Sequence, residues 1–232
     1  MSHVTDFNHY VTDARAFIES LFDFKAGGKI SIIGHSMGGL ISLKLSAILG
    51  PTSVHSVSTV APMLCFKTPP FPWSVAGVLG LILPNIGLGS HYTVGFPKPN
   101  WEPVLQNWPI KCSHSIERNA CWVRQQFANP QITLAGPSNT WVASAWKGCD
   151  TFLKRYVHGT ERYPVPWLIV RATEDRFVHE ESQDMFAAAQ RGGGRFVRVE
   201  GAYHEVLIEC DGLRDRALGE ITEFVKVRKR EA

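Results

Sequence analysis

The sequence lacks any run of apolar residues long enough to cross a bilayer. Its longest apolar stretch, Trp73 to Leu83, is interrupted by Ser74 and two glycines, whereas a membrane-spanning helix needs about 20 apolar residues. The N-terminus also lacks the basic and then apolar order of a secretory signal peptide, because it carries His3, Asp6 and Asp13. We therefore expect a cytoplasmic protein, and peripheral contact with a membrane surface stays open.

Net charge and cysteine are also scarce. A formal net charge of +3 over 232 residues is too small for a nucleic-acid footprint, so we expect no nucleic-acid partner. The five cysteines are odd in number and contain no C-x-x-C pair, which argues against a zinc site or a redox motif. Free thiols in a reducing compartment fit this pattern, although spacing alone leaves a bridge between Cys112 and Cys121 open.

The composition is that of a globular domain, with 44% hydrophobic and 19% charged residues. Short β-branched segments alternate with stretches of helical periodicity, beginning with an apolar face every three or four residues from Val4 to Leu21. Alternation of this kind predicts an α/β fold with a mostly parallel sheet flanked by helices. The expected strands are residues 30–33, 54–60, 166–171 and 195–199.

The composition changes between about Leu64 and Tyr163, where proline, tryptophan, asparagine and serine are frequent. Five of the seven tryptophans lie between Trp101 and Trp146. This region predicts an inserted, mostly helical lobe. The chain then divides into a first core part at 1–63, a cap insertion at 64–163 and a second core part at 164–232.

A short motif at the end of the first expected strand carries the chemistry. The sequence Gly34-His35-Ser36-Met37-Gly38 matches G-x-S-x-G between a strand and a helix, a turn that exposes its serine. Glycines on both sides should prevent clashes in so tight a turn. Ser36 is therefore the predicted nucleophile, and the Met37 N–H at the helix N-terminus is the predicted oxyanion donor.

A serine needs a base and a group that orients the base. Asp175 and His204 follow the third and fourth expected strands, which places them at the same sheet edge as Ser36. Glu174 is the rival acid, and we expect it to be a solvated loop residue. Other histidines are expected to be structural: His35 packed beside the serine, His179 at a helix start, and three in the insertion, namely His91, His114 and His158.

Three segments resemble a known group of enzymes. Gly-His-Ser-Met-Gly-Gly at 34–39, Ala-Thr-Glu-Asp-Arg-Phe-Val at 172–178 and Gly-Ala-Tyr-His-Glu-Val-Leu-Ile-Glu at 201–209 resemble the lysophospholipase and monoacylglycerol lipase branch of the α/β-hydrolases. Residues 3–10, and 134–137 with Trp141, resemble a helix and part of the cap in that branch. The resemblance implies an acyl-enzyme on Ser36, with His204 as base and then acid and Asp175 as the orienting acid. It also implies a helical cap and no cofactor, and we expect no metal among the site residues.

The resemblance has one departure. Members of that branch carry strands ahead of the region that begins at His3, and a His-Gly loop there supplies the second oxyanion donor. This chain shows no equivalent segment near its N-terminus. Either it is a fragment or an alternative start of a longer protein, or it has lost one of the two oxyanion donors. Without the N-terminal strands, we expect the edge of the Ile30 strand to be unpaired.

Three functions compete on these grounds. The resemblance favours a serine hydrolase of single-acyl-chain lipid esters, a lysophospholipid or a monoacylglycerol. The same three residues would also serve an amidase, a peptidase or an esterase of small esters. The missing N-terminal region raises a third hypothesis, a truncated and non-catalytic hydrolase-like protein.

Overall fold

Four parallel strands form the sheet at the centre of the described structure. The computed structural model describes residues 1–232 apart from 70, 95–111, 133, 135, 191 and 231–232. The sheet has the order β1-β2-β3-β4, and each neighbouring pair is parallel. The predicted parallel α/β sheet is therefore confirmed. Its strands are β1 (Ile30–His35), β2 (Val54–Val60), β3 (Trp167–Ala172) and β4 (Gly194–Val199).

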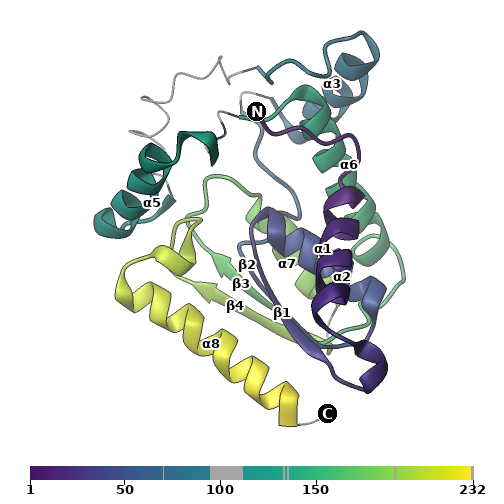
Figure 1. Cartoon of the computed structure of the whole chain (residues 1–232), viewed down its shortest axis with the longest axis vertical. Coiled ribbons are helices and arrows are strands. Elements are labelled where there is room, and N and C mark those ends of the chain that lie inside the picture. The colour runs from purple at the N-terminus through teal and green to yellow at the C-terminus, as the bar shows by residue number, and fades with distance from the viewer. Residues whose placement is uncertain (70, 95–111, 133, 135, 191, 231–232) are drawn as a thin grey trace.

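Helices cover both faces of this sheet (Figure 1). None of the described helices combines the length and the apolar character that a membrane span requires. Short 3-10 turns lie at η1 (Phe24–Ala26), η2 (Pro130–Ile132) and η3 (Val206–Ile208). The α-helices are α1 (Asn8–Leu21), α2 (Met37–Leu49), α3 (Trp73–Asn85), α5 (Ile116–Ala128), α6 (Asn139–Tyr156), α7 (Glu180–Ala189) and α8 (Asp211–Arg230).

The two faces of the sheet bury two separate apolar clusters. In β3, Ile169 points into one cluster, whereas Leu168 and Val170 point into the other, as the period of two along a strand requires. The first cluster also contains Leu43 of α2 and residues of α1, α6 and α7. The second is closed by the buried face of α8, which supplies Ala217, Ile221 and Phe224.

The first helix begins later than its apolar pattern predicts. The pattern starts at Val4, but α1 begins at Asn8, whose N–H donates to Asp6 Oδ1 at 2.8 Å. Residues before it pair elsewhere: the Ser2 N–H donates to the Gly136 carbonyl, and the Ser2 carbonyl accepts the Ser138 N–H, both at 2.9 Å. The chain ahead of α1 is therefore attached to a distant segment at Ser2, and the helix begins only after the turn at Asp6, whose carboxylate accepts the Asn8 N–H.

The segment between β2 and β3 contains α3, α5 and α6. Helices α3 and α5 lie at the end of the molecule toward which β3 and β4 run (Figure 1). Helix α6 instead reaches the core, where Ala145, Cys149 and Phe152 join the cluster that holds Phe7 and Trp167. The last helix of the expected insertion thus also stabilises the sheet.

All five cysteines are free thiols. The bridge between Cys112 and Cys121 that spacing leaves open is therefore not formed. Burial raises the pKa of both Cys65 and Cys112 to about 12. These two thiols are neutral near pH 7, so they are poor nucleophiles.

Helix α2 approaches the sheet closely through glycine. A Cβ added at Gly39 would lie 2.8 Å from Pro62 Cβ, and one added at Gly34 would overlap Ser42 Oγ. A Cβ at Gly38 would meet no atom within 4 Å in the described structure. The expected steric role of glycine therefore applies to Gly34 and Gly39, and the expectation for Gly38 is wrong in this respect.

We predict that Gly39→Ala lowers the free energy of unfolding by about 1–3 kcal/mol, because the added methyl group overpacks the contact with Pro62. Gly38→Ala is the matched control in the same helix and should be neutral or stabilising by up to about 1 kcal/mol, since alanine is the better helix former. Urea unfolding of both variants measures the difference. Equal urea midpoints for the two variants would show that the contact between α2 and Pro62 does not restrict the side chain at position 39.

Candidate active site

Ser36 lies in a strained turn between β1 and α2. Its backbone angles are φ 53° and ψ −121°, a region that residues with a side chain rarely adopt. Backbone hydrogen bonds hold this conformation. The Ser36 N–H donates to the Val60 carbonyl at 3.0 Å, and the Ser36 carbonyl accepts the N–H groups of Gly39 and Met63 at 2.9 Å and of Leu40 at 3.4 Å. The turn leaves the Ser36 hydroxyl within reach of the His204 ring.

His204 and Asp175 complete a hydrogen-bonded line with Ser36. The distance from His204 Nε2 to Ser36 Oγ is 2.8 Å, and that from His204 Nδ1 to Asp175 Oδ2 is 2.6 Å. The side chains of His204 and Asp175 are 6% and 1% exposed. The structure thus brings together the three residues that the sequence predicts, from loops after β1, β3 and β4.

The Asp175 carboxylate is held in its charged form. Burial alone would raise its pKa, but the hydrogen bond and charge of His204, with N–H donation from Phe177 and Val178, outweigh burial and lower the pKa. These two N–H groups reach Asp175 Oδ1 at 2.7 and 3.1 Å. A charged carboxylate only accepts hydrogen bonds, so His204 Nδ1 carries the proton and Nε2 can accept the Ser36 hydroxyl proton.

Glu174, the rival acid, lies in a different environment. Its side chain is exposed, and its backbone N–H donates to the Ala202 carbonyl at 3.0 Å. The neighbouring Asp175 points inward because its carboxylate closes the turn to Phe177 and Val178. The turn therefore places adjacent carboxylates on opposite sides.

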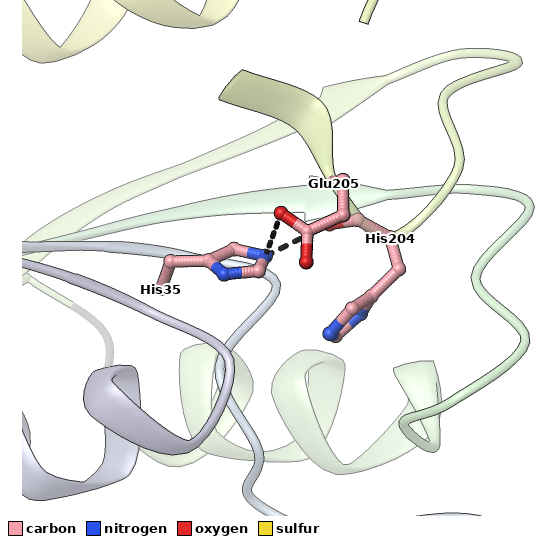
Figure 2. A group of neighbouring side chains, drawn as sticks. All are labelled: His35, His204 and Glu205. Atoms are coloured by element: carbon pink, nitrogen blue, oxygen red, sulfur yellow. Dashed lines mark hydrogen bonds and ion pairs between the residues drawn. The ribbon is translucent and has the colours of Figure 1, made fainter. Parts of the chain in front are cut away.

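His35 binds the backbone of the histidine loop. Its Nε2 lies 3.0 Å from the His204 carbonyl oxygen and 3.7 Å from Glu205 Oε2. Figure 2 shows the His35 ring directed toward the Glu205 carboxylate and the His204 ring directed away from it. Burial lowers the pKa of His35, so the neutral ring donates its Nε2 proton to the His204 carbonyl.

The same three residues form the candidate metal-binding group in the described part of the chain. One ligand atom each from His35, His204 and Glu205 lie within 4.8 Å of one another. Both ring nitrogens of His204 already bond to Asp175 and Ser36. A cation here would have to displace the Ser36 contact, so hydrogen bonding within the chain accounts for this group better than metal binding does.

The N-terminus of α2 lies directly after Ser36. Met37 is the first residue of α2, so its N–H has no acceptor within the helix. Free N–H groups at this end of a helix favour negative charge. The predicted oxyanion donor is thus placed directly after Ser36, and we assign no second donor among the described residues.

Two hollows in the described surface lie away from these residues. One of about 670 Å³ follows the outer side of α8 near Leu218 and Thr222. A smaller one, of about 90 Å³, lies between the start of α1 and α6 near Asp6 and Lys147. Neither is lined by Ser36 or His204, so both lack the groups that the chemistry needs.

Two side chains near the site were not singled out by the sequence analysis. Lys67 Nζ donates to the backbone carbonyl of Asp175 at 2.6 Å. Glu209 is fully buried and accepts the N–H of Tyr203, the residue before His204. Its sequence signal is its place at the end of the segment 201–209, which carries the family resemblance, and its partner His114 lies in the expected insertion.

Comparison with known proteins gives a consistent family. Residues 1–211 match the family Hydrolase_4, described as serine aminopeptidase, S33. The chain is 28% identical to lysophospholipase L2 of Escherichia coli K12, covering 97% of this chain and 65% of that protein. It is 24% identical to human monoglyceride lipase, covering 97% of this chain and 67% of that protein. The chain thus spans slightly less than two thirds of the bacterial relative.

Solved structures share the fold. The monoacylglycerol lipase of Paleococcus ferrophilus superposes with a TM-score of 0.68 at 20% identity, covering 96% of this chain and 76% of that one. A soluble variant of the Saccharomyces cerevisiae monoglyceride lipase gives 0.72 at 15% identity, covering 97% and 71%. At these identities the likeness shows the α/β-hydrolase fold.

We predict that Ser36→Gly is more stable than Ser36→Ala by about 1 kcal/mol. Both variants lack the hydroxyl, but only alanine keeps a Cβ at the positive φ, where a side chain costs about 1–3 kcal/mol and glycine loses somewhat more chain entropy. Thermal unfolding of the two variants in one buffer measures the difference. A glycine variant less stable than the alanine variant would argue against strain at this turn.

Proposed function

The chain belongs to the Hydrolase_4 family of α/β-hydrolases, and on this premise we propose that it is a serine carboxylic-ester hydrolase of lipids with a single acyl chain. The observation that carries the proposal is the hydrogen-bonded line from Ser36 through His204 to Asp175. The relatives named lysophospholipase and monoglyceride lipase support a lysophospholipid or a monoacylglycerol as the substrate.

In the proposed first half-reaction, Ser36 Oγ attacks the ester carbonyl carbon while His204 Nε2 takes the hydroxyl proton. Asp175 holds the imidazole in the required tautomer and stabilises the imidazolium. The carbonyl oxygen becomes an oxyanion, which the Met37 N–H binds. The tetrahedral intermediate then expels the alcohol, which receives the proton from His204, and the acyl group remains on Ser36.

The second half-reaction removes the acyl group with water. His204 Nε2 takes a proton from the water, and the resulting hydroxide attacks the acyl carbon. Collapse of the second tetrahedral intermediate returns the proton to Ser36 Oγ and releases a fatty acid. No cofactor or metal enters either half-reaction in this proposal.

The proposed oxyanion site has one assigned donor, the Met37 N–H, and the resemblance implies a second donor on a His-Gly loop. Removal of one such donor from a serine hydrolase costs roughly 100- to 1,000-fold in turnover. A non-catalytic protein of the same fold is the alternative that differs most from the proposal.

Helix α3 supports a lipid substrate and peripheral contact with a membrane. The helix carries no charged residue, and Val78, Leu81 and Ile82 on it are each about half exposed. Exposed apolar side chains in one helix can contact an acyl chain or a lipid surface. We propose that the segment 64–163, of which 70, 95–111, 133 and 135 lie outside the described residues, acts as a cap over Ser36 and binds the acyl chain. The proposed location is the cytoplasm.

A peptidase or amidase is the second candidate, and the description of the matching family as a serine aminopeptidase favours it. The three residues would act identically on an amide, because only the leaving group changes. An esterase of small esters is the third candidate. Substrate comparison separates all three.

We predict that Asp175→Asn lowers turnover by roughly 10,000-fold, because the amide donates to His204 Nδ1 and so holds the imidazole in the wrong tautomer. Glu174→Gln is the matched control, since it removes an adjacent but exposed carboxylate, and it should change turnover less than about threefold. Steady-state kinetics on one ester measures both variants. The opposite ranking would reject Asp175 as the orienting acid and leave Ser36 unaffected.

We predict that kcat/KM rises with acyl length in a series of monoacylglycerols and lysophospholipids until the binding region is full. Each buried methylene contributes about 0.8 kcal/mol, or roughly fourfold. Ser36→Ala is the control and should cleave no member of the series. A fluorophosphonate probe should label Ser36 in the wild-type chain.

Each alternative has its own outcome in that experiment. Faster cleavage of aminoacyl amides than of any ester would favour the peptidase. A preference for the shortest esters would favour the small-ester esterase. Absence of both labelling and turnover would support the non-catalytic protein and reject the proposed function.

A further inference from the structure

A buried carboxylate lies beneath the loop that carries His204. Glu209 is 0% exposed, and four N–H groups donate to its two oxygens. Oε1 accepts the Tyr203 backbone N–H at 3.0 Å and the His114 Nδ1 proton at 2.9 Å, while Oε2 accepts the backbone N–H groups of His114 and Cys210 at 3.0 and 3.1 Å. A buried carboxylate requires such donors to offset its loss of water.

These donors keep Glu209 charged. Burial by itself would raise the pKa of Glu209, but donation from the Tyr203 N–H and from His114 outweighs burial, and the pKa lies below its usual range. The side chain of Arg118 also donates to the Glu209 backbone carbonyl. Charge-assisted hydrogen bonds of this kind are stronger and more directional than neutral ones.

The donors of Glu209 come from two segments that are far apart in the sequence. Tyr203 and Cys210 bracket the loop that carries His204, and His114 belongs to the segment between β2 and β3. The same two segments are joined again where the Glu205 N–H donates to the Cys112 carbonyl at 2.8 Å. Glu209 therefore joins the two ends of the His204 loop by hydrogen bonds, and it also binds this loop to the residues around His114.

Side-chain contacts also join the His204 loop to the residue that follows Asp175. The rings of His114 and Tyr203 stack with centroids 3.8 Å apart. The Arg176 guanidinium lies 4.8 Å from the centre of the Tyr203 ring, and its Nη2 donates to the Tyr203 hydroxyl at 3.2 Å. Tyr203 directly precedes His204, and Arg176 directly follows Asp175. The contact between Tyr203 and Arg176 therefore joins the chain neighbours of His204 and Asp175.

We propose that Glu209 is a positioning residue, which fixes the His204 loop through the Tyr203 N–H and joins it to the segment that contains His114. The proposal rests on the proposed function of Ser36 and His204. The loop has no regular secondary structure from Gly201 to Glu205, so its direction depends on these hydrogen bonds. Loss of the Glu209 charge lets the loop shift and lengthens the contact from His204 Nε2 to Ser36 Oγ.

The main test is Glu209→Gln in the full chain. Glutamine keeps the shape, but its NH₂ group cannot accept the N–H groups that one carboxylate oxygen accepts in the wild type. A displacement of about 1 Å in a catalytic group costs up to about 100-fold in rate. We expect kcat on a lipid ester to fall about 10- to 100-fold with KM changed less than about twofold, and the second-order rate of fluorophosphonate labelling to fall by the same factor as kcat.

Two further variants separate positioning from folding. Glu200→Gln is the matched control, because Glu200 is exposed and lies three residues before Tyr203, and it should change neither rate. His114→Phe keeps a ring to stack on Tyr203 but removes the Nδ1 donor, and it should lower kcat about threefold to tenfold. Rates are normalised to protein that remains folded by circular dichroism at the assay temperature.

A spectroscopic measurement provides a readout that a purely structural role would not change. The His204 Nδ1 proton, held by Asp175 at 2.6 Å, should give a low-field proton resonance in folded wild-type protein. We expect this resonance to shift or broaden in Glu209→Gln and in His114→Phe, and to stay unchanged in Glu200→Gln.

The outcomes distinguish this proposal from the proposed function. Wild-type protein that is folded but neither labels nor hydrolyses esters would reject the proposed function, and an unchanged His204 resonance in folded Glu209→Gln would then reject the positioning role as well. Active wild-type protein with unchanged labelling, kcat and resonance in folded Glu209→Gln rejects the positioning role alone. If Glu209→Gln fails to fold, the test rests on His114→Phe. Wild-type values of kcat and of the labelling rate in His114→Phe would then reject the proposal.

Discussion

Strands β1, β3 and β4 run in the same direction, so the residues that follow them leave the sheet at one edge. Ser36 follows β1 directly, Asp175 comes three residues after the end of β3, and His204 comes five residues after the end of β4. In a parallel sheet this edge is common to every strand, and loops there can meet even when they are far apart in the chain. The alignment of Ser36, His204 and Asp175 depends on this parallel register, which the apolar clusters on both faces stabilise.

The candidate site contains a strained backbone turn and buried charges, and hydrogen bonds from nearby backbone groups offset their cost. Ser36 has a positive φ, and Asp175 and Glu209 are charged groups out of contact with water. Each is compensated by backbone groups: Val60, Gly39 and Met63 for the serine turn, and N–H donors from the surrounding loops for each carboxylate. Both carboxylates are therefore fixed by main-chain geometry, which makes the position of His204 sensitive to small changes in the loops.

Much of this arrangement could be predicted from the sequence, since it depends on local patterns. Apolar periodicity located the strands and most helices, and the spacing of Gly34 and Ser36 located the turn. The features that were not predicted depend on contacts between distant segments. Ser2 pairs with residues 136–138, a contact that no local pattern indicates, and the open space around Gly38 is visible only in three dimensions.

The contact between Glu209 and His114 is the clearest example of a contact between distant segments that the sequence does not predict. A glutamate in a loop is usually solvated, and only the fold reveals that residues about 90 positions earlier bury this one. His114 similarly lies in a segment without strand context, so its sequence surroundings gave no sign of a partner. Sequence reasoning predicted the three residues that the structure brings together, Ser36, His204 and Asp175, but not the buried carboxylate of Glu209.

The distance along the chain between Ser36 and His204 also affects biosynthesis. The two residues are 168 positions apart. Strand β2 can pair with β3 only after the whole segment between them has been made, since Val57 lies opposite Trp167. At a synthesis rate of about 5–20 residues per second, the serine leaves the ribosome roughly 10–30 s before its histidine. During that interval Ser36 lacks its hydrogen bond to His204, so the line of three residues forms only after the C-terminal strands have been made and have docked.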